Sequence, residues 1–195
     1  DSTFWQPVQL ARDNGDCDLQ IEKATYYLDN ISNPIKEISA HYYMATCYYT
    51  SGQKNEALYH YDFITTKPNN NYFTESLKYA GEITFESENY KLALGHFSTL
   101  ENVGVTQEDL SLSKRGQMYC FYYLHNFQSA IIYAKKVLLL NHPNDKVVED
   151  ANLFLANSYK ELGLLDSALI SYENVIATAK SEAAAEAKYN MCHIY

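Results

Sequence analysis

The sequence predicts an all-α fold built from repeated pairs of helices. Glycine and proline are scarce, with 7 and 4 in 195 residues, which argues against an all-β fold of many short strands. Four segments superpose on a reference alanine at intervals of 36, 37 and 38 residues, namely on Ala57, Ala93, Ala130 and Ala168. A repeat of this period is typical of stacked helical units, in which each unit buries its apolar face against its neighbours.

The same kinds of residue surround each reference alanine at fixed distances. A small residue stands twelve positions before it, an aromatic one nine before and another aromatic four after. Counted with the alanine itself, 13 of 16 positions fit. Those before the alanine are Ala45, Gly81, Met118 and Ala156, then Tyr48, Thr84, Phe121 and Tyr159; those after it are Tyr61, Phe97, Ala134 and Tyr172. Small residues let two helices approach closely, and a ring on the same face fills the adjoining space.

Turns are expected between the two helices of each unit. They fall near Ser51-Gly52, Ser87-Glu88, Leu124-His125 and Leu162-Gly163. Gly52 and Gly163 suit the left-handed backbone conformation that often ends a helix. The extra residues of the longer repeats are expected between units, as lengthened turns in Lys67–Phe73, Asn102–Gln107 and Asn141–Lys146.

These residues resemble the tetratricopeptide repeat (TPR), a helix–turn–helix unit of about 34 residues. The resemblance covers residues 35 to 180. Thr84 and Ala134 depart from it, because they replace expected aromatic residues. Among TPR proteins, the repeats are most similar in style to those of bacteria. The resemblance implies an all-α, right-handed α-α superhelix, a TPR solenoid. We expect one domain over 1–195, with a degenerate first repeat at 1–34, four repeats at 35–70, 71–106, 107–143 and 144–180, and at 181–195 the first helix of a truncated repeat or a cap.

The two ends fit the repeat less well. Asp18 to Ile31 is expected to be the second helix of the first unit, with Ala24 aligned to Ala57 and a partner helix near Phe4–Arg12. Ser181 to Tyr195 resembles a first helix without its mate, which would leave an apolar face open. We therefore expect the native protein to continue beyond this sequence.

Charge argues against two classes of partner. With 15 basic and 24 acidic residues the formal net charge is −9, whereas attraction to a phosphate backbone requires a positive surface. No stretch approaches the roughly 18 apolar residues of a membrane span. Neither nucleic acid nor direct membrane insertion is expected.

The four cysteines are predicted to be unpaired. Cys47 and Cys120 occupy the same repeat position two units apart, beyond disulfide reach, and are expected to be small buried hydrophobes. Cys192 lies further away still, and Cys17 is expected to be the most exposed thiol. Free cysteines favour a reducing compartment, whereas the similarity to bacterial TPR proteins leans towards the periplasm or cell envelope, so the compartment stays open.

The sequence contains no recognisable catalytic or metal-binding motif. No C-x-x-C pair is present, and no two of the six histidines are spaced i, i+4. The acidic run Asp13–Asp18 lacks the order of a calcium loop, and Asp16 or Asp18 is expected to cap the next helix. Glu75, Glu82 and Glu86 share a helix face that is expected to be solvated. No enzymatic activity, cofactor or metal is expected.

Partner binding is expected instead. The resemblance implies that the first helices of successive units line a concave groove in which ligands lie. When the groove positions of the family are carried over to this sequence residue by residue, the groove-lining residues are Tyr42, Thr46, Tyr49, Lys78, Glu82, Phe85, Arg115, Tyr119, Tyr122, Leu153, Asn157, Lys160, Tyr189 and His193. For each of these tyrosines, packing between helices is as good an interpretation as partner binding. The basic and asparagine constellation with which some TPR proteins grip a C-terminal carboxylate is absent, because its places hold Tyr42, Thr46, Lys78 and Glu82.

We therefore expect a non-enzymatic scaffold that holds a segment of a partner protein in this groove. The alternative is a structural module that self-associates or packs within a larger multi-repeat protein. A third possibility is a regulatory domain fused to an enzyme. The sequence does not identify the partner.

Overall fold

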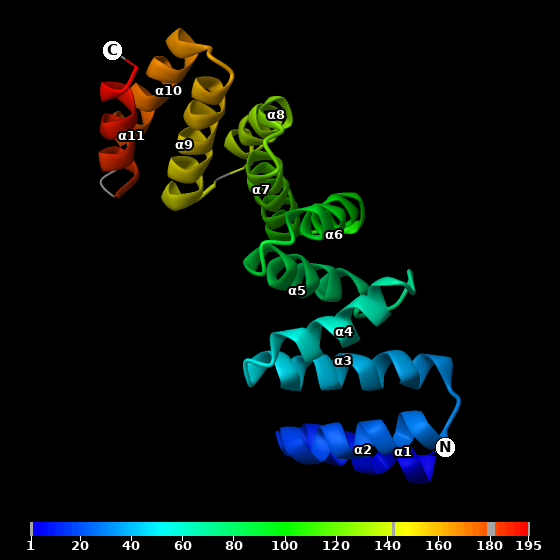
Figure 1. Cartoon of the computed structure of the whole chain (residues 1–195). Coiled ribbons are helices and arrows are strands. Elements are labelled where there is room, and N and C mark those ends of the chain that lie inside the picture. Colours follow the sequence, from blue (N-terminus) through cyan, green and yellow to red (C-terminus); the bar gives the residue numbers. More distant parts are fainter. Residues whose placement is uncertain (1, 142, 179–181, 195) are drawn as a thin grey trace. The chain divides into compact units, whose positions relative to one another are not determined.

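The computed structural model describes residues 2–141, 143–178 and 182–194, and every regular element within these ranges is an α-helix (Figure 1). His142, in the third lengthened turn, and the end residues of the predicted segment 181–195 lie outside the described residues. The helices are α1 (Ser2–Asp13), α2 (Cys17–Asn30), α3 (Pro34–Thr50), α4 (Lys54–Thr65), α5 (Phe73–Glu86), α6 (Tyr90–Val103), α7 (Gln107–Tyr123), α8 (Phe127–Leu138), α9 (Asp145–Glu161), α10 (Leu165–Thr178) and α11 (Glu182–Cys192).

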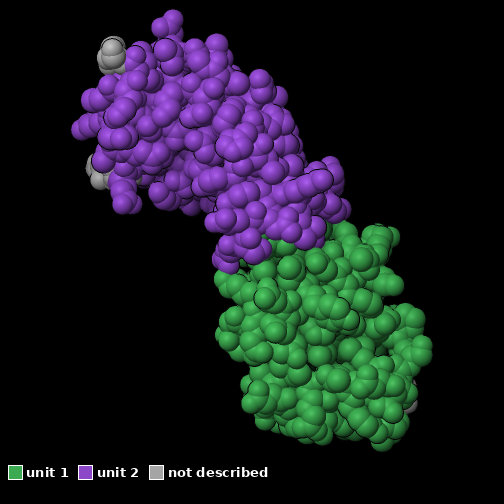
Figure 2. Space-filling view, viewed as in Figure 1, with its two compact units in different colours: residues 1–84 green, residues 85–195 purple. Residues whose placement is uncertain are grey.

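The chain divides into two compact units, residues 1–84 and 85–195 (Figure 2). Unit 1 contains α1 to α4 and most of α5, and unit 2 contains the end of α5 and α6 to α11. In unit 1, α2 packs on α1 and on α3, and α3 packs on α4. In unit 2 each helix from α6 to α11 packs on the next, and α9 additionally contacts both α7 and α11. Contacts between alternate helices are the stacking expected of a helical repeat, so the predicted all-α repeat fold is confirmed.

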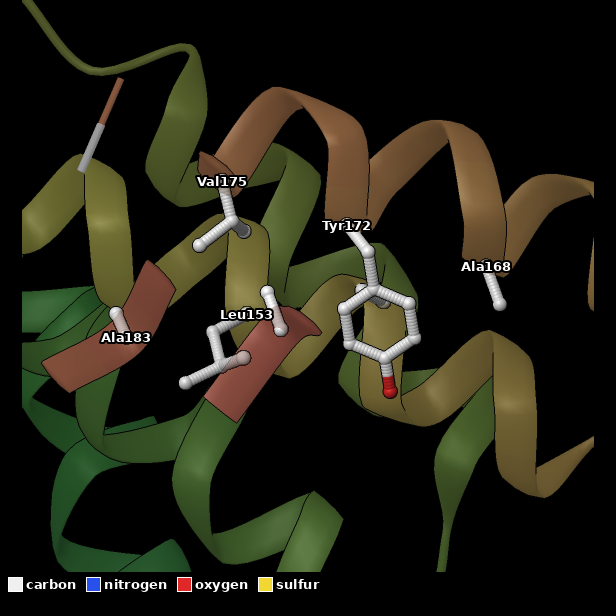
Figure 3. Packing of buried hydrophobic residues seen from close by; sticks show 7 residues of the cluster. Leu153, Ala168, Tyr172, Val175 and Ala183 are labelled. Carbon is white, nitrogen blue, oxygen red and sulfur yellow. The ribbon is translucent and has the colours of Figure 1, made fainter. Parts of the chain in front are cut away.

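The repeat columns form the core of each unit. All four reference alanines are fully buried. In unit 2 Tyr172 of α10 packs with Leu153 of α9, Ala183 of α11 and its helix neighbours Ala168 and Val175 in one cluster (Figure 3). The three departures from the pattern, Thr84, Met118 and Ala134, are buried as well. The buried hydroxyl of Thr84 is satisfied inside its own helix, where it donates to the carbonyl oxygen of Ala80 at 2.6 Å.

Side-chain caps fix where several helices begin. The Asp16 carboxylate accepts a hydrogen bond of 3.0 Å from the backbone N–H of Leu19, which confirms that this acidic run caps a helix. Asn33 caps α3, whose first residue is Pro34. Thr106 and Asp109 form a reciprocal capping box at the start of α7. These polar groups satisfy N–H groups that have no partner inside the helix.

The predicted turns are confirmed, and each holds one residue with a positive φ. Gly52 has φ +81° and Gly163 φ +71°, and the equivalent residues Glu88 and His125 have φ +60° and +57°. Gly15, with φ +68°, ends α1 in the same way. Counted from this turn, Gln20 rather than Ala24 stands at the place of Ala57, so the alignment of Ala24 was wrong by one helical turn.

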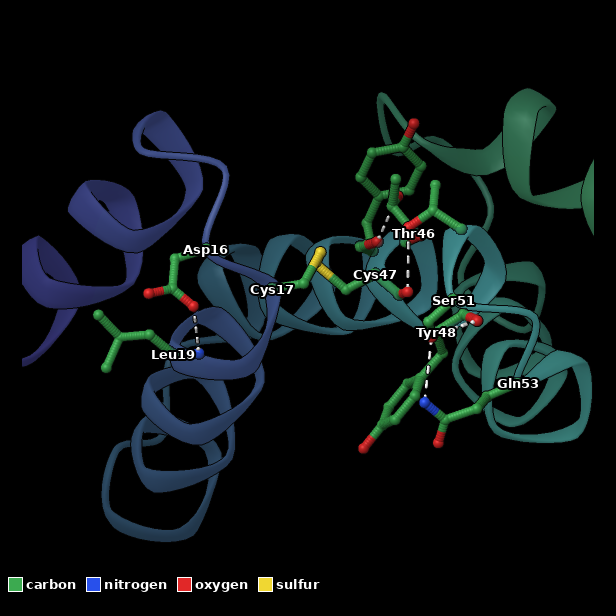
Figure 4. The surroundings of a disulfide bond; sticks show 10 residues. Asp16, Cys17, Leu19, Thr46, Cys47, Tyr48, Ser51 and Gln53 are labelled. Atoms are coloured by element: carbon green, nitrogen blue, oxygen red, sulfur yellow. Dashed lines mark hydrogen bonds between the residues drawn. A yellow bond between two sulfur atoms is a disulfide. The ribbon is translucent and has the colours of Figure 1, made fainter.

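A disulfide joins Cys17, the first residue of α2, to Cys47 in the last turn of α3 (Figure 4). Their Cα atoms are 5.3 Å apart. The prediction of four unpaired cysteines is therefore wrong for these two. The argument that four free cysteines favour a reducing compartment therefore no longer holds, because disulfides persist where the surroundings are oxidising. Cys120 is free and buried, as predicted, and Cys192 is free and exposed.

Candidate functional site

A cleft of about 650 Å³ opens in unit 2 between α7, α9 and α11. These are alternate helices of the repeat, so the cleft lies on the face that the sequence predicts to be concave. We call it the α7–α9–α11 cleft. Its lining residues are Tyr122, Tyr123, Lys146, Asp150, Leu153, Phe154, Asn157, Glu182, Ala183, Ala185, Glu186 and Tyr189.

Aromatic rings form one wall of the cleft. The ring of Tyr122 meets the ring of Phe154 edge-on, with centroids 4.9 Å apart, and also contacts Tyr123 and Phe127 at 5.6 Å. Because neighbours hold it on several sides, Tyr122 is positioned before any ligand arrives. Tyr189, on α11, is 65% exposed, so much of its surface is open to a partner.

A hydrogen-bonded network of amides forms the floor of the cleft. Asn157 is buried, and its side-chain oxygen accepts hydrogen bonds from the Tyr172 hydroxyl at 2.5 Å and the Asn190 amide at 3.2 Å. Its amide nitrogen donates to the Glu186 carboxylate at 3.2 Å. Lys160 donates to the Asn190 side-chain oxygen at 2.9 Å. The network ties α9, α10 and α11 together and fixes the Glu186 carboxylate at the edge of the cleft.

The lining residues carry more negative than positive charge. Asp150 is matched by Lys146, whose ammonium group lies 3.0 Å from one carboxylate oxygen, while the Tyr119 hydroxyl donates to the other at 3.0 Å. Glu182 and Glu186 supply two further carboxylates. Burial, followed by the carboxylates of Glu161 and Glu186, raises the pKa of Tyr122 above its usual range. With three carboxylates and one ammonium group among its lining residues, the cleft favours a cation over an anion.

The structure places four of the predicted groove residues in this cleft, namely Tyr122, Leu153, Asn157 and Tyr189. Other predicted residues of unit 2 lie around it. Tyr119 holds Asp150, and Lys160 holds Asn190. Phe85 packs its ring 5.9 Å from that of Tyr119 and 6.0 Å from that of Tyr123. Arg115, on α7, and His193, next to α11, are not among the lining residues.

In unit 1 the predicted tyrosines contact other rings. Tyr42 stacks on Tyr72 with centroids 4.1 Å apart, and Tyr49 meets Tyr79 at 4.7 Å. The hydroxyl of Thr46 donates to the Tyr42 carbonyl oxygen at 2.9 Å. Burial, and next the neighbouring Glu75 carboxylate, raises the pKa of Tyr42 well above its ordinary value. These rings pack α3 against α5 and its preceding turn. The predicted Lys78 and Glu82 are half-buried on α5.

Several residues of the cleft were missed by reasoning from sequence. The residues of α9 that line the cleft are spaced three or four apart, as residues on one face of a helix are. They are Lys146, Asp150, Leu153 with its neighbour Phe154, and Asn157. The columns carried over from the repeat begin only at Leu153, so the first two turns of that face were left out. Extending this spacing towards the N-terminus of the helix would have found Asp150.

Comparison with known proteins identifies the fold. No protein-family model matches the sequence, and no curated protein matches it either. Among solved structures, the MamA protein superposes with a TM-score of 0.67 at 14% identity, over 94% of this chain and 93% of that one. The TPR-like repeats of a kinesin light chain from Podosopora anserina superpose with a TM-score of 0.59 at 15% identity, over 91% and 95%.

The chain is thus a TPR-type helical-repeat protein in fold. Within the described ranges no three His, Cys, Asp or Glu side chains gather as a metal site, and no helix has the length and apolar character needed to cross a membrane.

Proposed function

We propose that this protein is a binding scaffold that holds a segment of a partner protein in the α7–α9–α11 cleft. The observation that carries the proposal is the cleft itself, a concave site of about 650 Å³ with a preformed aromatic wall. Tyrosine and phenylalanine bury much area at low entropic cost, and such rings often dominate binding energy at interfaces. Because the wall and floor are already held by their neighbours, little rearrangement is needed on binding.

Selection from a displayed library of random 12-residue peptides tests this proposal. Peptides selected on the parent chain are then measured on Tyr189→Ala, which removes an exposed ring of the cleft. Tyr59→Ala is the matched control, because Tyr59 is 70% exposed on α4 and is remote in sequence from the cleft helices. We expect Tyr189→Ala to weaken binding about tenfold and Tyr59→Ala to leave it unchanged.

Both variants are first shown to match the parent in helicity and melting temperature. Peptides that bind Tyr189→Ala as tightly as the parent would contradict the proposal, as would failure to select any peptide. Loss of binding in Tyr59→Ala alone would place the site on the outer helices instead.

A second candidate function, self-association, rests on a different observation. Ile132 of α8 and Ile170 of α10 stand at the same repeat position and are 54% and 61% exposed. Isoleucines that recur at one exposed position offer an apolar surface to a second copy. Sedimentation equilibrium of the parent and of Ile132→Lys/Ile170→Lys tests it: mass that rises with concentration in the parent alone would favour this function.

A further inference from the structure

We infer that the partner segment presents a lysine or arginine side chain, which enters the α7–α9–α11 cleft between its carboxylates and its aromatic wall. The inference rests on the proposed function, because it specifies the chemistry of the ligand that the same cleft takes. It follows from two independent features, the charge of the lining residues and the rings that stand beside them.

Charge complementarity is the first feature. The lining residues include three carboxylates and one ammonium group, and Lys146 is already paired with Asp150 at 3.0 Å. Asp150, and to a smaller extent the Glu182 carboxylate, raises the pKa of Lys146, so this one ammonium group lies near two of the three carboxylates and the lining keeps an excess of negative charge. The amide of Asn157 holds the Glu186 carboxylate through one oxygen at 3.2 Å, and a carboxylate can accept several further hydrogen bonds. An acidic ligand would meet like charges, which is unfavourable.

The aromatic wall is the second feature. Tyr122 and Phe154 present ring surfaces in the same cleft as Glu186, and Tyr189 adds a largely exposed ring on the same helix as Glu186, three residues further on. A lysine or arginine side chain matches this pair of surfaces, since its apolar stem packs on rings while its charged head meets a carboxylate. A neutral apolar side chain would use the rings but add no partner for the carboxylates, of which Glu186 is held by the Asn157 amide.

The test uses peptides selected on the parent chain. We expect them to be enriched in lysine and arginine, and replacement of the enriched lysine by methionine to weaken binding about tenfold. On the protein, Glu182→Gln and Glu186→Gln should each weaken binding about fivefold, as expected for a single ion pair of a partly exposed site. Glutamine at position 186 keeps an acceptor for Asn157, so the floor of the cleft is preserved.

Glu173→Gln is the matched control, because Glu173 is exposed on α10 and its loss changes the net charge equally. It should leave binding unchanged. Glu186→Lys should reject the lysine peptide and bind its Lys→Glu counterpart more tightly than the parent does.

The possible failures are distinguishable. Two results would overturn this inference and leave the proposed function standing, both with peptides that bind Tyr189→Ala more weakly than the parent. In the first, these peptides lack basic residues. In the second, they bind Glu182→Gln and Glu186→Gln as tightly as the parent. Peptides that bind Tyr189→Ala unchanged, or failure to select any, would overturn both. An equal loss on Glu173→Gln would show a general charge effect and overturn the inference alone.

Discussion

Positive φ angles recur at one position of the repeat, but the residue there differs from unit to unit. Gly52 and Gly163 adopt this conformation without a Cβ, whereas Glu88 and His125 adopt it with one. The left-handed region costs about 1 kcal/mol for an ordinary residue, because Cβ crowds the backbone. Sequence reasoning found all four turns from their spacing, but assigned this conformation only to the glycines.

Two substitutions at this position should change stability in opposite directions. Gly52→Ala should lower the free energy of unfolding by about 1 kcal/mol, through backbone strain alone, since a Cβ there meets no atom within 4 Å. Glu88→Gly should raise it by about 0.5 kcal/mol, because relief of strain exceeds the added entropy of the unfolded chain. Urea unfolding measures both, and a stabilising Gly52→Ala would contradict this explanation.

Two buried histidines face each other in unit 1. The Nδ1 atoms of His41 and His60 are 2.8 Å apart, so one neutral ring donates and the other accepts. His41 also stacks on Phe63 with centroids 3.9 Å apart, and His60 stacks on Tyr48 at 5.6 Å. Burial lowers the pKa of each histidine to about 4, and for His41 the charge of His60 adds to the effect. Both are therefore neutral in the folded protein at pH 7.

The pair should make unit 1 sensitive to acid. Histidine in an unfolded chain has a pKa near 6.5. Between about pH 6.5 and 4, His41 and His60 therefore bind more protons in the unfolded chain than in the folded one. The stability that the neutral pair contributes is complete above about pH 6.5 and falls as the pH drops towards 4, by up to about 1.4 kcal/mol per pH unit for each proton bound. His41→Phe/His60→Leu should flatten this slope in urea unfolding followed from pH 7.5 to 4.

His193→Gln is the control, because His193 is exposed in unit 2. A parent and double variant with the same slope would show that the pair does not carry the acid sensitivity.

The Cys17–Cys47 disulfide joins two neighbouring helices, and its position follows from their geometry. Helices α2 and α3 form an antiparallel hairpin, and each cysteine is 15 residues from Ser32 in the connection between them. Residues equally far from the middle of such a connection lie side by side. Sequence reasoning compared cysteines at equal positions of different units and missed this relation, although the helices themselves were expected.

Reduction of the disulfide should destabilise unit 1. With a sequence separation of 30 residues, closing this loop is worth about 3.6 kcal/mol through the entropy of the unfolded chain. Hydrogen exchange with and without dithiothreitol should show faster exchange in α2 and α3 on reduction and unchanged exchange in α9 and α10. Cys17→Ala/Cys47→Ala should behave like the reduced parent.

Thiol titration of the unreduced, denatured protein gives an independent check. It should find two thiols per chain, those of Cys120 and Cys192. Four thiols, or equal effects of reduction on both units, would contradict the assignment.

At the scale of the whole molecule the fold was more predictable than the site. The alanine and aromatic columns identify the helices, because each column is a buried contact that any unit of this kind needs. The site depends on which side chains a particular stack leaves open. Tyr49 and Tyr122 occupy equivalent places, yet Tyr49 packs on the ring of Tyr79 while Tyr122 lines a cleft. That difference arises from neighbours such as Tyr79, which lie outside the repeat columns.

The central claim is that a partner segment binds in the α7–α9–α11 cleft, and photo-cross-linking tests it most directly. The photoreactive residue p-benzoylphenylalanine replaces Tyr123, which is 43% exposed at the cleft, or Tyr59 on α4 as the control. Each protein is irradiated with the tightest selected peptide, and cross-links are located by mass spectrometry. We expect a cross-link from position 123 and none from position 59. A cross-link from position 59 alone would contradict the claim.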